Sequence, residues 1–491
     1  MNKLQTVHVR VNDTATGKPT PVRVRFTDGA GAYYAPFGRL RDFSIARALG
    51  VGGAVLIDGL PWAYIAGACE IDLPPGPIRV QACKGPEYRP LDQTMTLIAG
   101  KLSLRLTIER WVNLRDEGWV SGDMRCHFLA PHSALLEAQA EDLGVVNLLI
   151  AEGRARDESG APQRWLANID DFSGQTAALA TAGHLVAVNS YNTSPLGALS
   201  LLHCHRVVYP LHFEALNWTL ADWCGQCHRK KGLVVWAVRD WIERGFDVCE
   251  PLANLVCGDI DALEVEPAGV EALHRFWNAG LRGVPVGASG KASNAQPLGA
   301  LRTYARIGPG EELNYGRWVE AVRAGHTFVS DGPLVWFAAA GQEAGGVADI
   351  PEIQDKVPIR ARVAGLQAPG LLRIVRGGAI IAEARPGPAQ REVSIEIEAS
   401  IETSDWFQAL CVSDGVAATG SFALTAPVYV RRGGRPFQPR SRERGDLEAT
   451  LGAYPRLLDA LQARGLFPTE QDRSRLEQVF ATARARLSIS D

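Results

Sequence analysis

Residues 118–127 read GWVSGDMRCH, and at this stretch the pattern of apolar residues along the chain changes. Before it, apolar and polar residues alternate, as at Val7, Val9 and Val11, which is typical of half-buried strands. After it, short apolar runs are separated by helical stretches, a pattern that predicts a parallel sheet with crossover helices. We therefore expect an open or closed β/α barrel over residues 111–334.

The regions on either side of the expected barrel are predicted to be all-β. Residues 1–110 favour a first β-sandwich, and the alternation that returns at Val393, Ile395 and Ile397 favours a second one over residues 335–430. Residues 431–491 predict a basic linker and two amphipathic helices, which either cap the barrel or form a homo-oligomer contact. The expected fold class is multidomain, α/β plus all-β.

Length and charge exclude some classes of protein. A chain of 491 residues is too long for a single small binding module. The 51 Lys and Arg residues are balanced by 54 Asp and Glu residues, which gives no electrostatic reason to expect a nucleic acid or an anionic membrane as partner. No apolar run reaches the roughly 18 to 20 residues of a membrane span, and the first residues lack a secretory pattern. We expect a cytoplasmic protein with reduced cysteines.

Polar side chains gather where the predicted barrel strands end. They are Asp123, Arg125, His127, Glu152, Glu264 and Lys291. Because active sites of β/α barrels lie at the carboxyl ends of the strands, we expect these side chains to share one pocket for an anionic or carbonyl-bearing ligand. Buried charges need partners, so Arg125 is expected to bridge Asp123 and a partner such as Glu264, which leaves Lys291 for the ligand. The alternative is a structural cluster of ion pairs that holds the strands in register.

A family resemblance begins at the same stretch. Residues 118–127 resemble the first metal motif, Gly-Asp-x-His-x-His, of the carbaryl-hydrolase-like (CehA/McbA) metallohydrolases, relatives of the PHP phosphoesterase barrels. Residues 302–304 (RTY), 324–333 (AGHTFVSDGP) and 425–430 (TAPVYV) resemble further segments of that family, and the resemblance covers about 430 residues. It implies a PHP-like barrel between two β-sandwiches. It also implies hydrolysis of ester, amide or carbamate bonds, in which a metal-bound water attacks the carbonyl.

The chain departs from the family pattern at several ligand positions. Arg125 replaces the first His of His-x-His, Lys291 lies where an Asp-x-His follows a late strand, and Glu152 lies where an Asp-His pair follows the second strand. The resemblance then implies at most one Zn²⁺ or Mn²⁺ per chain, for which imidazole and carboxylate are suitable ligands. The ligands expected for such an ion are His127, Glu152, His184 and His205. Alternatively, His127 is a hydrogen-bonded core histidine and His205 is an exposed loop residue.

The resemblance also suggests roles for the remaining residues. Glu152 is expected to orient the attacking water, and Arg125 and Lys291 to stabilise the negative charge that develops on the substrate. The substrate-binding residues are expected to be Arg302, Asp123 and Glu264. Two functions remain open. One is a metal-dependent hydrolase of a small molecule, and the other is a catalytically degenerate barrel that binds a carbohydrate or another protein.

Residues 223–228, WCGQCH, contain a Cys-x-x-Cys-His motif, which in isolation suggests c-type haem attachment. The motif lies in a predicted helical stretch over residues 213–230, and no export signal accompanies it, so we expect no haem. Cys224 and Cys227 are expected to pack on the inner face of this helix. Reversible thiol chemistry, or a zinc site shared with Cys204 and His228, remains an alternative.

Overall fold

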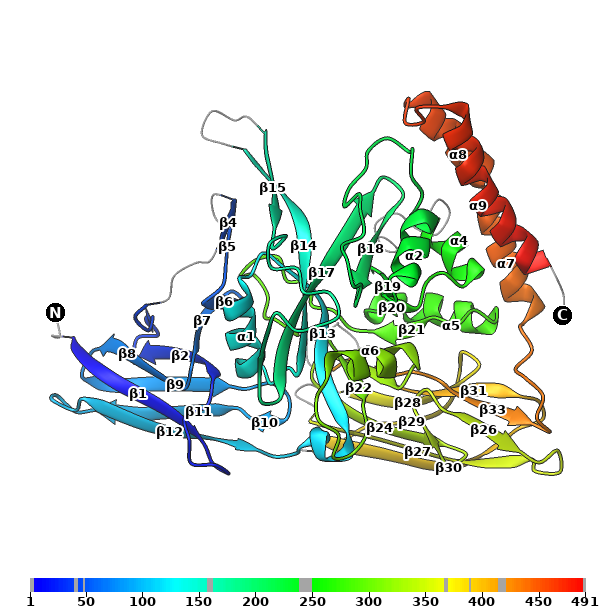
Figure 1. Ribbon diagram of the computed structural model, residues 1–491. Helices are drawn as coiled ribbons and strands as arrows, with labels where there is room; N and C mark the ends of the chain where they lie inside the picture. Colours follow the sequence, from blue (N-terminus) through cyan, green and yellow to red (C-terminus); the bar gives the residue numbers. More distant parts are fainter. Residues whose placement is uncertain are drawn as a thin grey trace.

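The computed structural model describes residues 4–38, 43–46, 49–156, 162–237, 250–365, 370–387, 390–413 and 421–488. The chain is mixed α/β, with more strand than helix and with several sheets. Figure 1 shows the N-terminal strands at one end, the central strands and helices in the middle, the C-terminal strands beside them, and a helical tail along the central helices. No helix in the described residues is both long enough and apolar enough to cross a membrane.

The N-terminal region consists of strands that enclose a core of their own, in which Val7, Val9 and Val11 are fully buried. These strands are β1 (Gln5–Asp13), β2 (Val22–Asp28), β3 (Tyr33–Tyr34), β4 (Phe43–Ala46), β5 (Leu49–Val51), β6 (Ala54–Ile57), β7 (Leu60–Ile65), β8 (Ala68–Leu73), β9 (Gly76–Cys83), β10 (Tyr88–Arg89), β11 (Leu91–Leu97) and β12 (Ser103–Arg110). The strands form a four-stranded sheet, a larger sheet around β2 and β9, and the pair β4–β5. The predicted alternation is thus confirmed here, because its apolar members point inward.

The central region alternates strands with helices only in part, because β14 to β18 follow one another with no helix between their described residues. Its elements are η1 (Leu114–Glu117), β13 (Trp119–His127), α1 (Pro131–Ala140), β14 (Val145–Arg156), β15 (Pro162–Ala167), β16 (Leu179–Thr181), β17 (His184–Ser194), β18 (Gly197–Leu202), α2 (Leu220–Arg229), β19 (Leu233–Trp236), α4 (Glu250–Cys257), β20 (Ala262–Glu264), η2 (Pro267–Gly269), α5 (Val270–Asn278), β21 (Val284–Val286), β22 (Arg302–Arg306), α6 (Tyr315–Arg323) and β23 (Thr327–Ser330). Helix α1 begins at Pro131, and proline is well suited to a first helical turn.

The central strands form a closed ring. Strands β13, β14 and β17 are parallel neighbours, as are β19, β20 and β21, and the antiparallel strand β18 joins the two sets. The ring closes after β21, where residues 287–291 return to β13: Gly290 N donates to Arg125 O at 3.0 Å and His127 N donates to Lys291 O at 2.7 Å. The second halves of the parallel strands therefore meet at one end of the ring.

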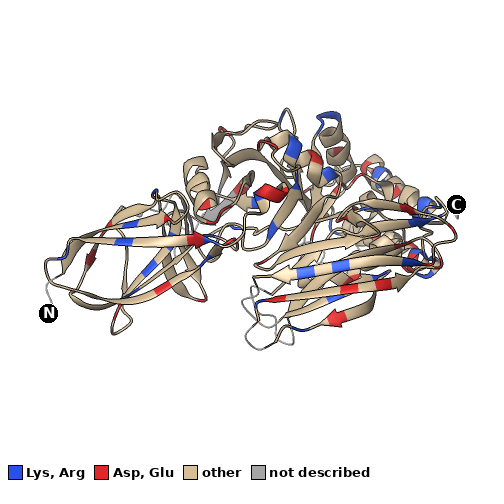
Figure 2. Cartoon of the chain, turned by 90° about the horizontal axis from the view of Figure 1, so that it is seen from below, with Lys and Arg blue, Asp and Glu red and all other residues tan. Residues whose placement is uncertain are grey.

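The C-terminal region is again made of strands, followed by three helices. These elements are β24 (Leu334–Ala339), β25 (Gln342–Glu343), β26 (Val347–Ile350), β27 (Lys356–Ala364), β28 (Gly370–Arg376), β29 (Ala379–Ala384), β30 (Glu392–Ser400), β31 (Asp405–Ser413), β32 (Ala423–Thr425), β33 (Val428–Arg432), α7 (Ser441–Leu451), α8 (Tyr454–Ala463) and α9 (Glu470–Ser488). Lys and Arg lie beside Asp and Glu along these strands (Figure 2). Strand β23 pairs with β32, so the central and C-terminal strands share a continuous sheet.

The tail contains three helices where two were predicted, because the chain breaks at Gly452 between α7 and α8. Its apolar face, which includes Leu451, Leu458 and Phe480, belongs to the same buried core as Leu252 and Leu255 of α4. Of the two roles expected for the tail, the structure shows packing against the central helices. The homo-oligomer contact stays a prediction.

Candidate functional site

Arg125 and Glu264 form a buried ion pair at the carboxyl end of the ring. Arg125 Nε donates to Glu264 Oε1 at 2.8 Å, and Arg125 Nη2 donates to Glu264 Oε2 at 2.7 Å. Only 10% of the Arg125 side chain and 1% of the Glu264 side chain are exposed. The carboxylate of Glu264 raises the pKa of Arg125 against the opposing effect of burial, so the guanidinium remains charged. This bidentate geometry is the strongest that arginine makes with a carboxylate.

Asp123 lies two residues before Arg125, and its carboxylate is held by hydrogen bonds from the main chain and a hydroxyl. Oδ1 accepts from the main-chain N–H groups of Arg125 and Ser289 at 3.1 and 3.0 Å. Oδ2 accepts from Gly299 N at 2.8 Å and from the Ser289 hydroxyl. Burial raises the pKa of Asp123, while these donors lower it. The prediction that Arg125 bridges Asp123 and Glu264 is therefore wrong, because its guanidinium binds Glu264 and not Asp123. Asp123 instead ties strand β13 to two points of the loop between β21 and β22.

His127 ends β13 beside the same ion pair. Its ring packs edge-on against Tyr191 of β17 at a centroid distance of 5.0 Å, and Arg125 Cζ lies 5.6 Å from the centroid of the same Tyr191 ring. Burial lowers the pKa of His127 to about 3, and the nearby Arg125 charge acts in the same direction. The buried Nδ1 atom has no hydrogen-bond partner in the described structure. His127 is thus a neutral, buried histidine whose Nδ1 atom lacks a protein partner, and the core-histidine interpretation stays an alternative.

Lys291 does not face this cluster, contrary to the prediction. It lies opposite Cys126, whose side chain packs against α1, and its own side chain is fully buried on that outer side of the ring. Lys291 Nζ lies 3.3 Å from Glu137 Oε2 of α1 and donates to Gln296 O at 3.0 Å. The structure therefore places Lys291 in a structural ion pair between the ring and α1.

Arg302 is also turned away from the Arg125–Glu264 pair. Its Nε donates to Gly299 O and its Nη1 donates to Glu141 O, both at 2.9 Å. The side chain lines a cavity of about 500 Å³ between the N-terminal strands and the ring. Arg302 therefore supports the end of α1 and the loop that holds Asp123.

The four expected metal ligands do not come together. His127 is level with Leu149 of β14, and Leu149 is level with Asn189 of β17. His184 starts β17 five residues before Asn189, which places it about 16 Å from that level, toward the other end of the ring. The Nδ1 atom of His184 lies 2.7 Å from Leu143 O.

His205 and Glu152 complete the expected ligand set. His205 is exposed in the loop after β18, at the same end as His184, with Nδ1 3.2 Å from Lys230 O. Glu152 is half-buried on β14, three residues or about 10 Å beyond Leu149. Among the described residues, no three His, Cys, Asp or Glu side chains are grouped so that they could hold a metal ion. Since Arg125 also occupies both oxygens of Glu264, the residues present do not fit the expected ion.

The Cys-x-x-Cys-His motif lies on α2, where Cys224 and Cys227 are fully buried, as predicted. The partner of Cys227 is Cys204, with the two Sγ atoms 3.4 Å apart. His228 turns to Asp261, with Nε2 3.0 Å from Oδ2, and does not join the thiols. The eight cysteines that the structure describes are free thiols, and the motif serves packing.

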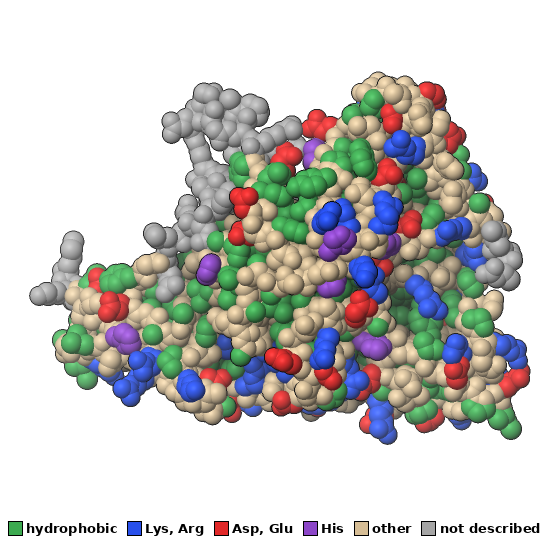
Figure 3. All heavy atoms as spheres, viewed as in Figure 1, with side chains coloured by type: hydrophobic (Ala, Val, Ile, Leu, Met, Phe, Trp, Pro, Cys, Tyr) green, Lys and Arg blue, Asp and Glu red, His purple; other side chains and the backbone are tan. Residues whose placement is uncertain are grey.

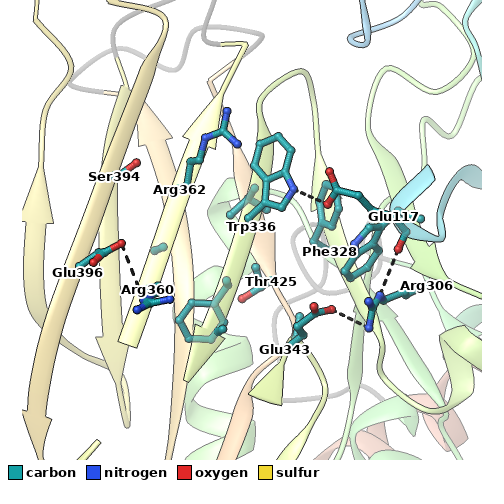
Figure 4. A pocket seen from close by; sticks show the side chains of 16 residues that line it. Glu117, Arg306, Phe328, Trp336, Glu343, Arg360, Arg362, Ser394, Glu396 and Thr425 are labelled. Atoms are coloured by element: carbon teal, nitrogen blue, oxygen red, sulfur yellow. Dashed lines mark hydrogen bonds and ion pairs between the residues drawn. The ribbon is translucent and has the colours of Figure 1, made fainter. Parts of the chain in front are cut away.

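Sequence reasoning missed a groove of about 300 Å³ between the ring and the C-terminal sheet (Figure 4). Trp336 of β24 stands in it, with Nε1 donating to Glu117 Oε2 at 2.8 Å and Arg362 Cζ 4.5 Å from the ring centroid. Arg306 Nη1 lies 2.8 Å from Glu343 Oε2 at one side of the groove. The lining residues come from separate stretches between Glu117 and Thr425, so no local sequence motif predicts them.

Comparisons with known proteins give no family for this chain. No family model matches it, and no curated protein matches it significantly. Among solved structures, an engineered protein is 11% identical, with a TM-score of 0.14, over 35% of this chain and 49% of the other. The chain thus spans about half the length of that protein, and a likeness this weak carries no argument about fold or function.

Proposed function

We propose that this chain is a ligand-binding relative of the CehA/McbA metallohydrolases, in which a PHP-like barrel between two β-sandwiches holds a small neutral molecule with a carbonyl group. The observation that carries the proposal is the Arg125–Glu264 pair, which places a fixed cation, Arg125, where the resembling family has a metal ligand. The guanidinium of Arg125 thus supplies the positive charge that a metal ion supplies in the resembling family. The proposed function is binding, without hydrolysis by a metal-bound water.

Two groups at the carboxyl end are suited to a carbonyl-bearing ligand. The pair with Glu264 uses Nε and Nη2 of Arg125, so the N–H groups of Nη1 remain outside that pair. The Nδ1 atom of His127 has no protein partner in the described structure, and a buried polar atom of this kind costs about 1 to 3 kcal/mol when left unsatisfied. A ligand that hydrogen-bonds to His127 and Arg125 recovers that cost.

The charges of the described residues favour a neutral ligand over an anion. Burial raises the pKa of Glu266, Glu264 adds to this effect, and Arg125 opposes it. Lys291 is engaged with Glu137 and does not offset these carboxylates. The free thiols fit a reducing compartment such as the cytoplasm.

The test is calorimetric titration with neutral esters, amides and carbamates, and separately with the carboxylates that their hydrolysis would release. We expect neutral compounds to bind and to be recovered intact, and His127→Ala to weaken binding at least tenfold. His132→Ala is the matched control, because His132 is exposed on α1. Steady turnover of a bound compound, or binding of carboxylates alone, would contradict the proposal.

A further inference from the structure

We propose that the groove around Trp336 is a second binding site, independent of the site at the carboxyl end, and that it takes a short neutral oligosaccharide. The groove lies between η1, β22 and β23 of the central region and strands β24, β25, β27 and β30 of the C-terminal region. Figure 4 shows Trp336 between Arg362 and Glu117, with Arg306 beside Glu343 and the pair Arg360–Glu396 across the sheet.

The charges in the groove cancel, which favours an uncharged ligand. Its lining contains three guanidinium groups and three carboxylates, from Arg306, Arg360, Arg362, Glu117, Glu343 and Glu396. Arg306 pairs with Glu343 at 2.8 Å, and Arg360 faces Glu396 at 3.9 Å. A charged ligand would have to compete with these ion pairs for the guanidinium or carboxylate groups. Adjacent hydroxyl groups of a sugar can donate to the carboxylates and accept from the guanidinium groups at the same time.

The polar side chains stand in two rows on one face of the sheet. Trp336, Arg362 and Ser394 are level across β24, β27 and β30, and Ala338, Arg360 and Glu396 form the next row along the same strands. Three neighbouring strands make each row about 10 Å long. Because Ala338 has a small side chain, the second row leaves space on the sheet surface beside the Trp336 indole. A linear, hydroxyl-rich chain matches this spacing better than a compact molecule.

Aromatic side chains provide the apolar surface that the C–H faces of sugar rings need. Trp119 and Phe328, which pack edge-on at a centroid distance of 5.1 Å, form the buried floor. Trp336 is half-buried, and its hydrogen bond to Glu117 and its contact with Arg362 fix the indole before any ligand arrives. A site that is already ordered loses less conformational entropy on binding.

A peptide strand is a poorer occupant of this groove. Strand β27, which runs through its middle, pairs with β24 on one side and with β30 on the other. Its main-chain donors and acceptors are therefore used within the sheet, and a peptide could not extend the sheet there. A ligand in the groove would instead contact side chains on the face of the sheet.

The experiment is a glycan array of neutral gluco-, manno-, xylo- and galacto-oligosaccharides, printed beside sulfated and uronate-containing ones, followed by titration of the best neutral binder. We expect binding to a neutral oligosaccharide, at least a tenfold loss for Trp336→Ala, and a loss of a few fold for Arg360→Ala. The side chain of Arg360 is 74% exposed, so its removal leaves the fold intact. Trp218→Ala, which removes a half-buried indole beside α2, is the matched control and should bind as the wild type does.

The outcomes separate this proposal from the one on the carboxyl-end site. His127→Ala should leave oligosaccharide binding unchanged, even where it abolishes binding of the carbonyl-bearing compounds. The proposal is overturned if no neutral oligosaccharide binds, if only the sulfated or uronate-containing ones bind, or if binding survives both Trp336→Ala and Arg360→Ala.

Discussion

Arg125 of β13 and Glu264 of β20 are joined by two hydrogen bonds of 2.8 and 2.7 Å across the interior of the ring, although their strands are not neighbours in the sheet. The pair fixes the distance at the carboxyl end between two strands of the ring that β21 separates. It also neutralises Glu264 with a side chain of the protein itself. Surface charges are arranged differently: on the face drawn in Figure 3, cationic and anionic side chains are interspersed.

Removal of Arg125 alone should destabilise the protein strongly. Arg125→Met leaves the Glu264 carboxylate buried without its cation, and breaking a buried pair in this way costs about 3–5 kcal/mol of the free energy of unfolding. The double variant Arg125→Met/Glu264→Leu should recover most of the loss, because no unpaired charge is left. Urea unfolding at pH 7 measures both. Arg431→Ala, which breaks an exposed pair with Asp349, should cost less than about 1 kcal/mol. An equally small effect of Arg125→Met would refute the structural role of the pair.

Lys291→Met should lower the melting temperature without changing ligand affinity. Lys291 is fully buried against Glu137, so the variant leaves a buried carboxylate without its partner, at a cost of about 3–5 kcal/mol. The sequence-based expectation, in which Lys291 contacts the ligand, predicts the reverse: lower affinity with nearly unchanged stability. Thermal unfolding and calorimetric titration of the same preparation distinguish the two.

His127 should make the protein less stable in acid. Its pKa is lowered to about 3 in the folded protein from an ordinary 6.5, so below pH 6.5 the unfolded chain binds a proton that the folded chain does not. The free energy of unfolding therefore falls as the pH drops from 6.5 toward 3, by up to about 1.4 kcal/mol per pH unit. His127→Asn removes this dependence. Unfolding curves at pH 7, 6, 5 and 4 should show a free energy of unfolding that depends less on pH in the variant than in the wild type. The same pH dependence in both proteins would contradict this role of His127.

Close packing of the Cys204 and Cys227 thiols against Gly232 should require a glycine at this position. A Cβ atom at this position would lie 2.3 Å from Cys204 Sγ and 2.6 Å from Cys227 Sγ. Gly232→Ala is therefore expected to cost about 1–3 kcal/mol through overpacking. Gly225→Ala, inside α2, meets only the end of the Arg229 side chain and should stabilise the helix by about 0.5–1 kcal/mol. Equal melting temperatures for the two variants would show that the thiols move aside easily.

The sequence predicted much of the fold where its periodicity was clear. Strand β13 begins at Trp119 and ends at His127, as expected. Strand β18, by contrast, was not predicted: all six of its residues are buried, so neither face imposes an alternation of apolar and polar residues. The turn before it is stabilised by Ser194 Oγ, which accepts from Leu196 N, a local contact that the apolar pattern does not reveal.

The candidate site was predictable to the extent that the carboxyl ends of parallel strands in one ring meet. This reasoning brought Arg125 to Glu264 correctly, because both lie at the carboxyl end of the ring. It failed for Lys291, since the register of the loop after β21 places this residue opposite Cys126 and so on the outer face. It failed for His184 because a residue that begins a strand lies at the opposite end from one that finishes it.

The most direct test of the central claim, that Arg125 stands in place of a metal ion, is elemental analysis. The wild-type protein is purified without chelator, dialysed against Zn²⁺ and Mn²⁺, desalted, and measured beside His127→Ala. The account predicts far less than one equivalent of metal in both proteins. One or more equivalents in the wild type, lost in His127→Ala, would contradict it and would show that the ring holds a metal centre despite the Arg125–Glu264 pair.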